Sequence, residues 1–248
     1  MLILLPPSEG KTSPQQGSPV DLAALSYPEL TRARLRVGRA LAVASGHKNA
    51  MAVLGAGTSL AEDVARNRTL WDNPTAPAAK VYTGVLYDAA GAATWDGATM
   101  QRADRRVRIV SALWGTLSPA DHIPAYRLSM GTTLGRIGPL AAFWREEVGA
   151  TLTREVAGQL VVDCRSSDYA TVWRSTPSDT VAIRVERDLN GKRAVVSHNA
   201  KFTRGLLTAA LVAPATEPSN PDDVAHIATQ ISGVKTVELR QGTLTIVV

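Results

Sequence analysis

The sequence begins MLILLPPSEGKT, residues 1–12, and no other segment says as much about how the chain folds. Residues 2–5 are apolar throughout, but the run is too short for a buried helix and ends at Pro6-Pro7. It therefore predicts an interior β-strand that passes directly into a loop. The loop, residues 8–12, carries hydroxyl, carboxylate and amine side chains, and ligands in open α/β sheets gather where strands run out into loops.

Further along the chain, helical and strand patterns alternate without a regular β-α-β repeat. Apolar residues at helical spacing predict helices, short apolar runs predict buried strands, and Asn190-Gly191 and Gln241-Gly242 predict hairpin turns. Ser26 and Glu29 have the spacing of a capping box at the start of the first helix. The expected fold is mixed α/β, in one domain over residues 1–248. The expected elements are helices over 28–45, 138–156 and 200–212, strands over 2–5, 107–113, 160–164, 181–185 and 194–197, and a last hairpin over 234–248.

The composition limits the class of protein. The chain has 248 residues, of which 45% are hydrophobic and 20% charged, enough for a substantial core. No apolar run approaches the roughly 18 to 20 residues of a membrane span, and prolines interrupt the opening where a signal peptide would stay apolar. We therefore expect a cytoplasmic protein without membrane contact. A single cysteine, Cys164, and four scattered histidines predict neither a disulfide nor a metal site, and no cofactor is indicated.

Charge is distributed unevenly along the chain. The net charge is +5, from 27 lysines and arginines and 22 acidic residues. Residues 101–136 hold six arginines and two aspartates, whereas residues 217–238 hold four acidic residues and one lysine. This uneven distribution favours an anionic partner for the basic part of the chain.

Five predicted strand ends share hydroxyl, lysine, arginine or tyrosine side chains. Such groups supply hydrogen-bond donors and positive charge to a phosphate or carboxylate without a metal. Taken singly, each has a simpler explanation, since a loop lysine is usually solvated and a tyrosine ring often belongs to the core. Taken together, they predict a site whose catalytic candidates are Lys11, Tyr82, Asp168 and Lys201. The ligand-binding candidates are Ser8, Thr12, Thr83, Gly84, Tyr126, Arg127, Ser166, Ser167, Tyr169 and Arg204.

The chemistry of these side chains suggests roles for an enzyme. Lys11 or Lys201 would act as nucleophile or proton donor if burial lowered its pKa, and Asp168 would act as a base. Arg127 and Arg204 would hold the anionic group. Gly10-Lys11-Thr12 lacks the upstream glycine of a phosphate-binding loop, so nucleotide hydrolysis of that type is excluded.

A second candidate site is Leu54-Gly55-Ala56-Gly57-Thr58-Ser59, which lies between two helical runs and resembles the hairpin of a helix-hairpin-helix element. Its two glycines let the backbone turn sharply and present N–H groups at a helix N-terminus, which suits a DNA phosphate. A glycine C-cap followed by an ordinary helix explains the same residues equally well. The DNA-binding candidates are Lys48, Gly55, Gly57, Thr58, Ser59, Arg66 and Arg68.

Six motifs occur in the order found in one protein family. They are LILLPPSEGKT (2–12), VYTGVLYD (81–88), VRIVSALWGTLSPADHIPAYRLSMG (107–131), Phe143-Trp144, VVDCRSSDYATVW (161–173) and VSHNAKFTRGLL (196–207). On these motifs the chain, over about residues 1–212, resembles the YaaA family of peroxide stress proteins. The tract from Ser111 to Gly131 is the most specific of them.

The resemblance implies a single domain with a curved mixed central sheet wrapped by helices, a basic cleft and a helix-hairpin-helix element. It also implies DNA binding and a cytoplasmic role in limiting iron-driven oxidative damage. Two departures concern the cleft: Ser8-Glu9-Gly10 adds a residue and a carboxylate before Lys11, and Cys164-Arg165-Ser166-Ser167 adds positive charge. By position, the family's cleft residues fall on Lys11, Tyr82, Thr83, Gly84, Tyr126, Arg127, Ser167, Asp168, Tyr169, Lys201 and Arg204.

Two functions from different classes remain open on the sequence. The first is a DNA-binding stress protein, although a net charge of +5 is modest for tight DNA binding. The second is an enzyme that acts on a small anionic or nucleotide-like substrate in the strand-end cleft. The oligomeric state is not indicated by any pattern.

Overall fold

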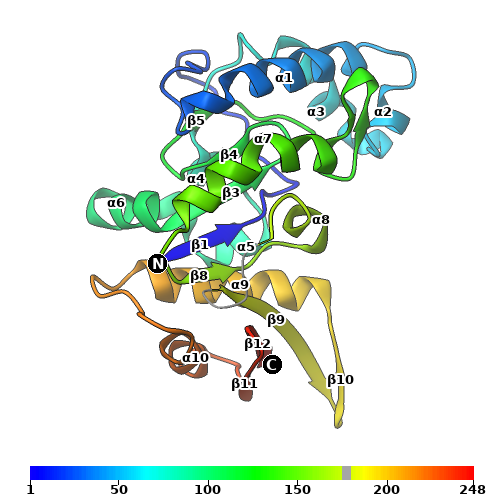
Figure 1. The fold of residues 1–248 in the computed structure, drawn as a ribbon. Helices are drawn as coiled ribbons and strands as arrows, with labels where there is room; N and C mark the ends of the chain where they lie inside the picture. Colours follow the sequence, from blue (N-terminus) through cyan, green and yellow to red (C-terminus); the bar gives the residue numbers. More distant parts are fainter. Residues whose placement is uncertain (175–179) are drawn as a thin grey trace.

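The central element of the fold is a mixed β-sheet, seen in a computed structural model that describes residues 1–174 and 180–248 (Figure 1). Its strand order is β11-β12-β9-β8-β1-β3-β4, and β10 pairs with β9. The five strands from β12 to β3 run parallel, whereas β4, β10 and β11 are antiparallel to their neighbours. The expected mixed α/β class is therefore confirmed. The strands are β1 (Leu2–Leu5), β3 (Val107–Ser111), β4 (Gly115–Leu117), β8 (Val161–Asp163), β9 (Thr180–Leu189), β10 (Lys192–Ala194), β11 (Thr236–Arg240) and β12 (Thr243–Val247).

Helices cover this sheet, with α7 in front of it and α9 behind it in Figure 1. Helix α9 packs against β9 and α5, and α7 packs against β4. No helix in the described ranges is long and apolar enough to cross a membrane. The helices are α1 (Thr31–Ser45), α2 (Ala50–Val53), α3 (Ala61–Arg66), α4 (Ala78–Val81), α5 (Val85–Ala89), α6 (Gly97–Arg106), α7 (Leu140–Glu155), α8 (Ser167–Ala170), α9 (Ser197–Val212) and α10 (Pro221–Thr229), and two short ladders pair β2 (Ala76–Pro77) with β5 (His122–Ile123) and β6 (Thr133–Leu134) with β7 (Gly138–Pro139).

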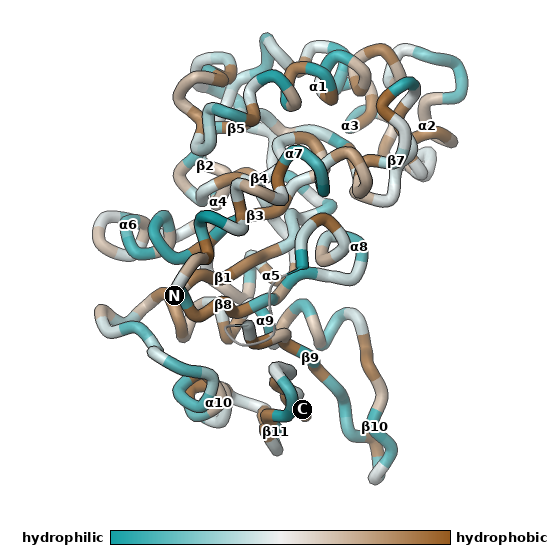
Figure 2. The backbone as a smooth tube through the Cα atoms, viewed as in Figure 1, coloured by the Kyte–Doolittle hydropathy of each residue, from teal (hydrophilic) through white to brown (hydrophobic). Residues whose placement is uncertain are grey.

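Strand β1 confirms the strand expected at residues 2–5 and lies inside the sheet. Ile3 pairs with Val107 of β3 on one side and with Val162 of β8 on the other. The four residues of β1 are at most 1% exposed. A strand covered on both faces and paired on both edges is apolar throughout rather than alternating, which is why Figure 2 shows β1 in brown.

Most of the other expected elements are present. A 3₁₀ turn over Pro28–Leu30 and α1 together match the helix expected at 28–45, and both predicted hairpin turns have residues with positive φ. Helix α9 begins at Ser197, so the strand expected at 194–197 was placed too late: β10 ends at Ala194. The sequence patterns did not indicate α10.

The expected capping box at Ser26 and Glu29 is wrong. Ser26 instead donates both its backbone N–H and its hydroxyl to Oδ1 of Asp121, at 2.8 and 3.0 Å. Tyr27, at φ 60°, occupies the N-cap position without a side-chain cap. Ser26 therefore bonds a buried carboxylate distant in sequence and does not cap the helix.

Candidate functional site

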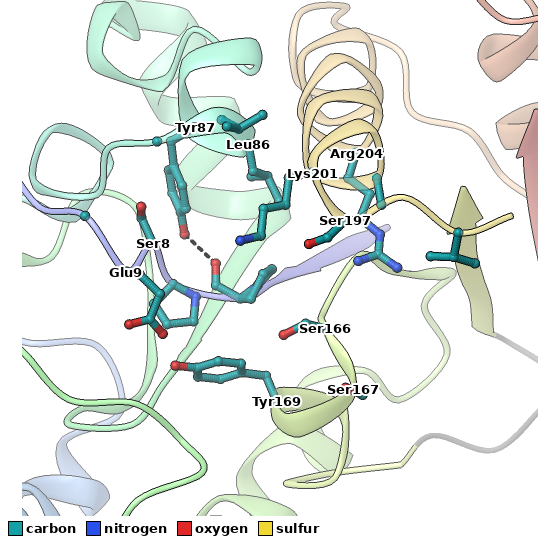
Figure 3. Close-up of a pocket in the computed structure, with 17 residues that line it drawn as sticks. Ser8, Glu9, Leu86, Tyr87, Ser166, Ser167, Tyr169, Ser197, Lys201 and Arg204 are labelled. Atoms are coloured by element: carbon teal, nitrogen blue, oxygen red, sulfur yellow. Dashed lines mark hydrogen bonds between the residues drawn. The ribbon is translucent and has the colours of Figure 1, made fainter. Parts of the chain in front are cut away.

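A cavity of about 560 Å³ lies where β1 and β8 end (Figure 3). These two strands are parallel neighbours, so their carboxyl ends meet at the same edge of the sheet. The walls come from the loop after β1, the first turn of α5, the loop that leads into α8, and the first two turns of α9. The strand-end pocket predicted from the sequence is thus formed by segments far apart along the chain.

The loop after β1 is held against α5 by a close fit. Tyr87 of α5 donates its hydroxyl to the carbonyl oxygen of Pro6 at 2.8 Å, the dashed line in Figure 3. Gly84, just before α5, has φ +111°, and a Cβ there would lie 2.9 Å from Oγ of Ser8. The positive φ therefore favours glycine at position 84, and any larger residue would also displace the Ser8 side chain.

One wall of the pocket is cationic. Helix α9 places Ser197, Lys201 and Arg204 along it, one helical turn apart (Figure 3). Nη2 of Arg204 donates to the carbonyl oxygen of Ile183 at 2.7 Å, but its buried Nε has no hydrogen-bond partner among the described residues. The N-terminal N–H groups and dipole of this 16-residue helix add positive potential at the same wall.

Tyr169 of α8 contributes a second donor that lacks a partner. Its side chain is buried, with the residue 5% exposed, and its hydroxyl makes no hydrogen bond of good geometry within the described part of the chain, although the Met130 backbone and the Ser129 side chain lie near it. Burial raises the pKa of Tyr169 and the nearby Glu9 carboxylate raises it further; these effects outweigh the Met130 backbone and the Ser129 side chain, which lower it, so the hydroxyl keeps its proton. Leaving such a group unpaired costs about 1–3 kcal/mol. A ligand or a water that accepts from the hydroxyl would remove this cost.

Lys11 lies beside the pocket and does not line it. Its Nζ donates to the carbonyl oxygen of Ser8 at 2.7 Å and sits 4.3 Å from the centre of the Tyr126 ring. Burial lowers the pKa of Lys11 from 10.5 to about 7; Glu9 opposes this change, and Arg127 reinforces it. A substantial fraction of this amine is therefore unprotonated near neutral pH, as a nucleophile or base requires.

Beneath Lys11, two tyrosine hydroxyls and a serine form a buried chain of hydrogen bonds. The hydroxyls of Tyr82 and Tyr126 are 2.9 Å apart, and Tyr126 is 2.7 Å from Oγ of Ser111 at the end of β3. Burial raises the pKa of both tyrosines. They stay neutral and are at most 2% exposed, so they support Lys11 from within the core.

Arg127 and Glu9 form an ion pair next to Lys11. Nη1 of Arg127 lies 2.8 Å from Oε2 of Glu9. The backbone of Arg127 is fixed by Asn67, which accepts from its N–H and donates to its carbonyl oxygen, both at 2.9 Å. The buried Nε of Arg127 has no partner in the described residues.

The structure divides the sequence candidates into groups. The cluster just described contains Lys11, Tyr82, Tyr126 and Arg127. Thr83 contacts the loop after β1, because its backbone N–H donates to the Gly10 carbonyl oxygen at 3.2 Å. Those that line the pocket are Ser8, Gly84, Ser166, Ser167, Tyr169, Lys201 and Arg204.

Two candidates lie apart from the pocket. Thr12 is exposed, and its backbone N–H donates to Val81 at 2.9 Å. Asp168 does not line the pocket and lies near Gly131, where an added Cβ would be 3.8 Å from its Oδ2. Three lining residues with polar side chains were missed, namely Glu9, Tyr87 and Ser197. Ser197 was missed because the strand expected at 194–197 included it, whereas it is the first residue of α9.

The Leu54–Ser59 segment joins α2 to a 3₁₀ turn (Thr58–Leu60) that continues into α3. Gly55 has φ +58°, its N–H donates to Ala52, and the N–H of Ala56 donates to Met51 at 2.9 Å. This is the Schellman motif of a helix C-cap, so the alternative explanation of Gly55 is correct. Gly57, Thr58 and Ser59 are exposed at the N-terminus of the next helical segment. Lys48 and Arg68 are also exposed. Arg66 forms an ion pair with Asp63, with Nη1 2.6 Å from Oδ1.

Metal and thiol chemistry find little support in the described ranges. They contain no group of three His, Cys, Asp or Glu side chains placed to hold a metal ion. Cys164 is fully buried at the end of β8, and burial raises the pKa of its thiol to about 12. The thiolate needed for oxidation is therefore scarce.

Comparison with known proteins places the chain in a family. Residues 1–232 match the family described as "Peroxide stress protein YaaA". A UPF0246 protein of Streptomyces coelicolor is 41% identical over 231 residues, which cover 91% of this chain and 88% of that protein. A UPF0246 protein of Corynebacterium efficiens is 41% identical over 258 aligned positions that cover both chains completely. The chain therefore belongs to the YaaA family of peroxide stress proteins.

Proposed function

We propose that the protein binds a small anionic or nucleotide-like ligand, through a phosphate or carboxylate group, in the pocket at the ends of β1 and β8. The observation that carries this proposal is that two residues lining one cavity, Arg204 and Tyr169, each hold a buried donor without a hydrogen bond in the described chain, Nε and the hydroxyl respectively. The start of α9 and Lys201 add positive charge there. Ligand sites typically combine such a cavity with a few convergent polar groups.

An enzyme built on this pocket would use Lys11 as its reactive group. The pKa of about 7 makes the amine available as a nucleophile or base. Lys11 directly follows Ser8, Glu9 and Gly10, which line the pocket. Tyr82 and Tyr126 would hold the amine in place through their rings, 5.5 and 4.3 Å from Nζ. The substrate would be the anionic ligand itself.

Calorimetric titration with methylphosphonate at low ionic strength tests the binding proposal. We expect Arg204→Gln to weaken binding by about tenfold or more, because a hydrogen bond to a charged group contributes about 1.5–3 kcal/mol. Arg39→Gln, which removes an exposed arginine from α1, is the matched control and should bind as the wild type does. Equal affinity in the wild type and Arg204→Gln, or no binding to the wild type, would refute the proposal.

DNA binding through the Leu54–Ser59 segment is the second candidate. It is favoured by the exposure of Gly57, Thr58 and Ser59 at a helix start, where backbone N–H groups lack intrahelical partners, and by the exposure of Lys48 and Arg68, close by in sequence. Glu62 and Asp63, in the first turn of α3, weaken the positive potential at this point. In a peroxide stress protein, such binding would shield DNA from iron-driven oxidation.

Gly57→Val provides a sharp test of this second candidate. Gly57 has an ordinary extended backbone, and a Cβ there meets no atom within 4 Å, so the variant should fold normally. The added side chain would nevertheless keep a phosphate away from the backbone N–H groups. We expect duplex, single-stranded or bulged DNA to bind the wild type in a salt-sensitive manner and Gly57→Val at least tenfold more weakly. Equal binding by both proteins, or none at low salt, would count against a DNA site here.

A further inference from the structure

Glu9 stands between the pocket and Arg127. It lines the pocket, and its carboxylate pairs with Arg127, which does not. The Glu9 side chain is 43% exposed on a loop, whereas the Arg127 side chain is 15% exposed and its backbone is fixed by Asn67. The arginine is therefore the fixed partner of this pair, and the carboxylate is the one with room to move into solvent.

The donors around Glu9 exceed what one carboxylate uses. Arg127 bonds it through Nη1 alone, and the buried Nε stays without a partner among the described residues, although a guanidinium suits bidentate anion binding. Tyr169 and Lys11 lie close enough for the Glu9 charge to affect the pKa of each. The Tyr169 hydroxyl is buried and makes no hydrogen bond of good geometry in the described chain, with Ser129 and the Met130 backbone nearby, and Figure 3 shows it on the same side of the pocket as the Glu9 carboxylate.

We propose that the carboxylate of Glu9 holds the place of a second anionic group of the ligand. The ligand class is then a compound with two acidic groups, such as a bisphosphate or a phosphorylated carboxylic acid. One group binds at Arg204 and the start of α9. The other displaces Glu9 and binds Arg127, with the Tyr169 hydroxyl as a further donor. This inference rests on the proposed anion pocket and specifies which ligands fit it.

A series of phosphonates tests the inference without knowledge of the natural ligand. Methylphosphonate probes one anion position, and α,ω-alkane bisphosphonates of graded chain length probe two positions at different separations. The proteins are the wild type, Glu9→Gln, the double variant Glu9→Gln/Arg127→Gln, and Glu146→Gln. The last removes an equal charge from an exposed position on α7 and serves as the matched control. Circular dichroism and thermal unfolding establish that each variant is folded.

We expect Glu9→Gln to bind at least one bisphosphonate about tenfold more tightly than the wild type does, because the ligand no longer competes with an internal carboxylate. Methylphosphonate affinity should stay within about twofold, and the added Arg127→Gln should abolish the gain. Equal changes for all ligands, or a gain that survives Arg127→Gln, would overturn the inference while leaving the single anion site intact. If methylphosphonate binds none of the proteins, the proposed function falls with it.

Discussion

Lys11 makes a measurable prediction about how stability depends on pH. Its pKa is about 7 in the folded protein and 10.5 when exposed, so the unfolded chain binds more protons between these values. The free energy of unfolding therefore rises with pH across this window. Below pH 7 the folded protein carries the full cost of a charged amine in a desolvated place, and above about pH 10.5 that cost is absent. Lys11→Met removes the titrating group.

The size of the effect follows from the difference between the two pKa values. At about 1.36 kcal/mol per pH unit, a change from 10.5 to about 7 corresponds to about 5 kcal/mol. Lys11 is only half-buried, so water reduces this figure, and we expect at least about 2 kcal/mol. Relative to the wild type, Lys11→Met should be most stabilised near pH 6 and should lose that advantage towards pH 10.

Urea unfolding of both proteins at several values between pH 6 and pH 10 measures this difference directly. Taking the difference between variant and wild type cancels the titration of every other group. Lys48→Met, which removes an exposed lysine, is the control and should give a curve parallel to that of the wild type. Parallel curves for Lys11→Met and the wild type would refute a desolvated, low-pKa lysine at this position.

Further predictions concern packing, buried polar groups and the thiol. Gly205→Ala should destabilise the protein by about 1–3 kcal/mol, because the added Cβ would lie 2.3 Å from a carbonyl oxygen of α5. Gly149→Ala, in open space on α7, should instead stabilise the protein by about 0.5–1 kcal/mol. Thermal unfolding of both variants measures these changes. Arg34→Met should cost at least about 3 kcal/mol in urea unfolding, since Arg34 donates to three backbone carbonyls within 3.0 Å. Cys164, with a pKa of about 12, should resist iodoacetamide at pH 8 until urea unfolds the chain.

The parts of the fold that were predictable depend on local patterns. Strand β1 could be recognised because burial on both faces makes all four of its residues apolar, and the hairpin at Asn190-Gly191 because its turn needs a positive φ. The capping box failed because Ser26 bonds Asp121, 95 residues away. No local spacing reveals such a competitor.

The candidate site shows the same limit. Residues at strand ends could be gathered from the sequence because parallel strands deliver their loops to one edge of the sheet. The sequence could not show that Arg127 would pair with Glu9, 118 residues away, or that Tyr82 and Tyr126 would be buried beneath Lys11. These contacts depend on how Tyr82 and the 126–127 segment approach the loop after β1, which is a property of the assembled core.

The central place of β1 sets the order of events during synthesis. This apolar strand is translated well before its partners, β3 at residues 107–111 and β8 at 161–163. At about 5–20 residues per second, translating the hundred or so residues before β3 takes roughly 5 to 20 s. Throughout that interval Leu2–Leu5 has no partner strand. An apolar strand with both edges unpaired is a template for pairing with another chain, so β1 is open to aggregation until β3 and β8 have been made.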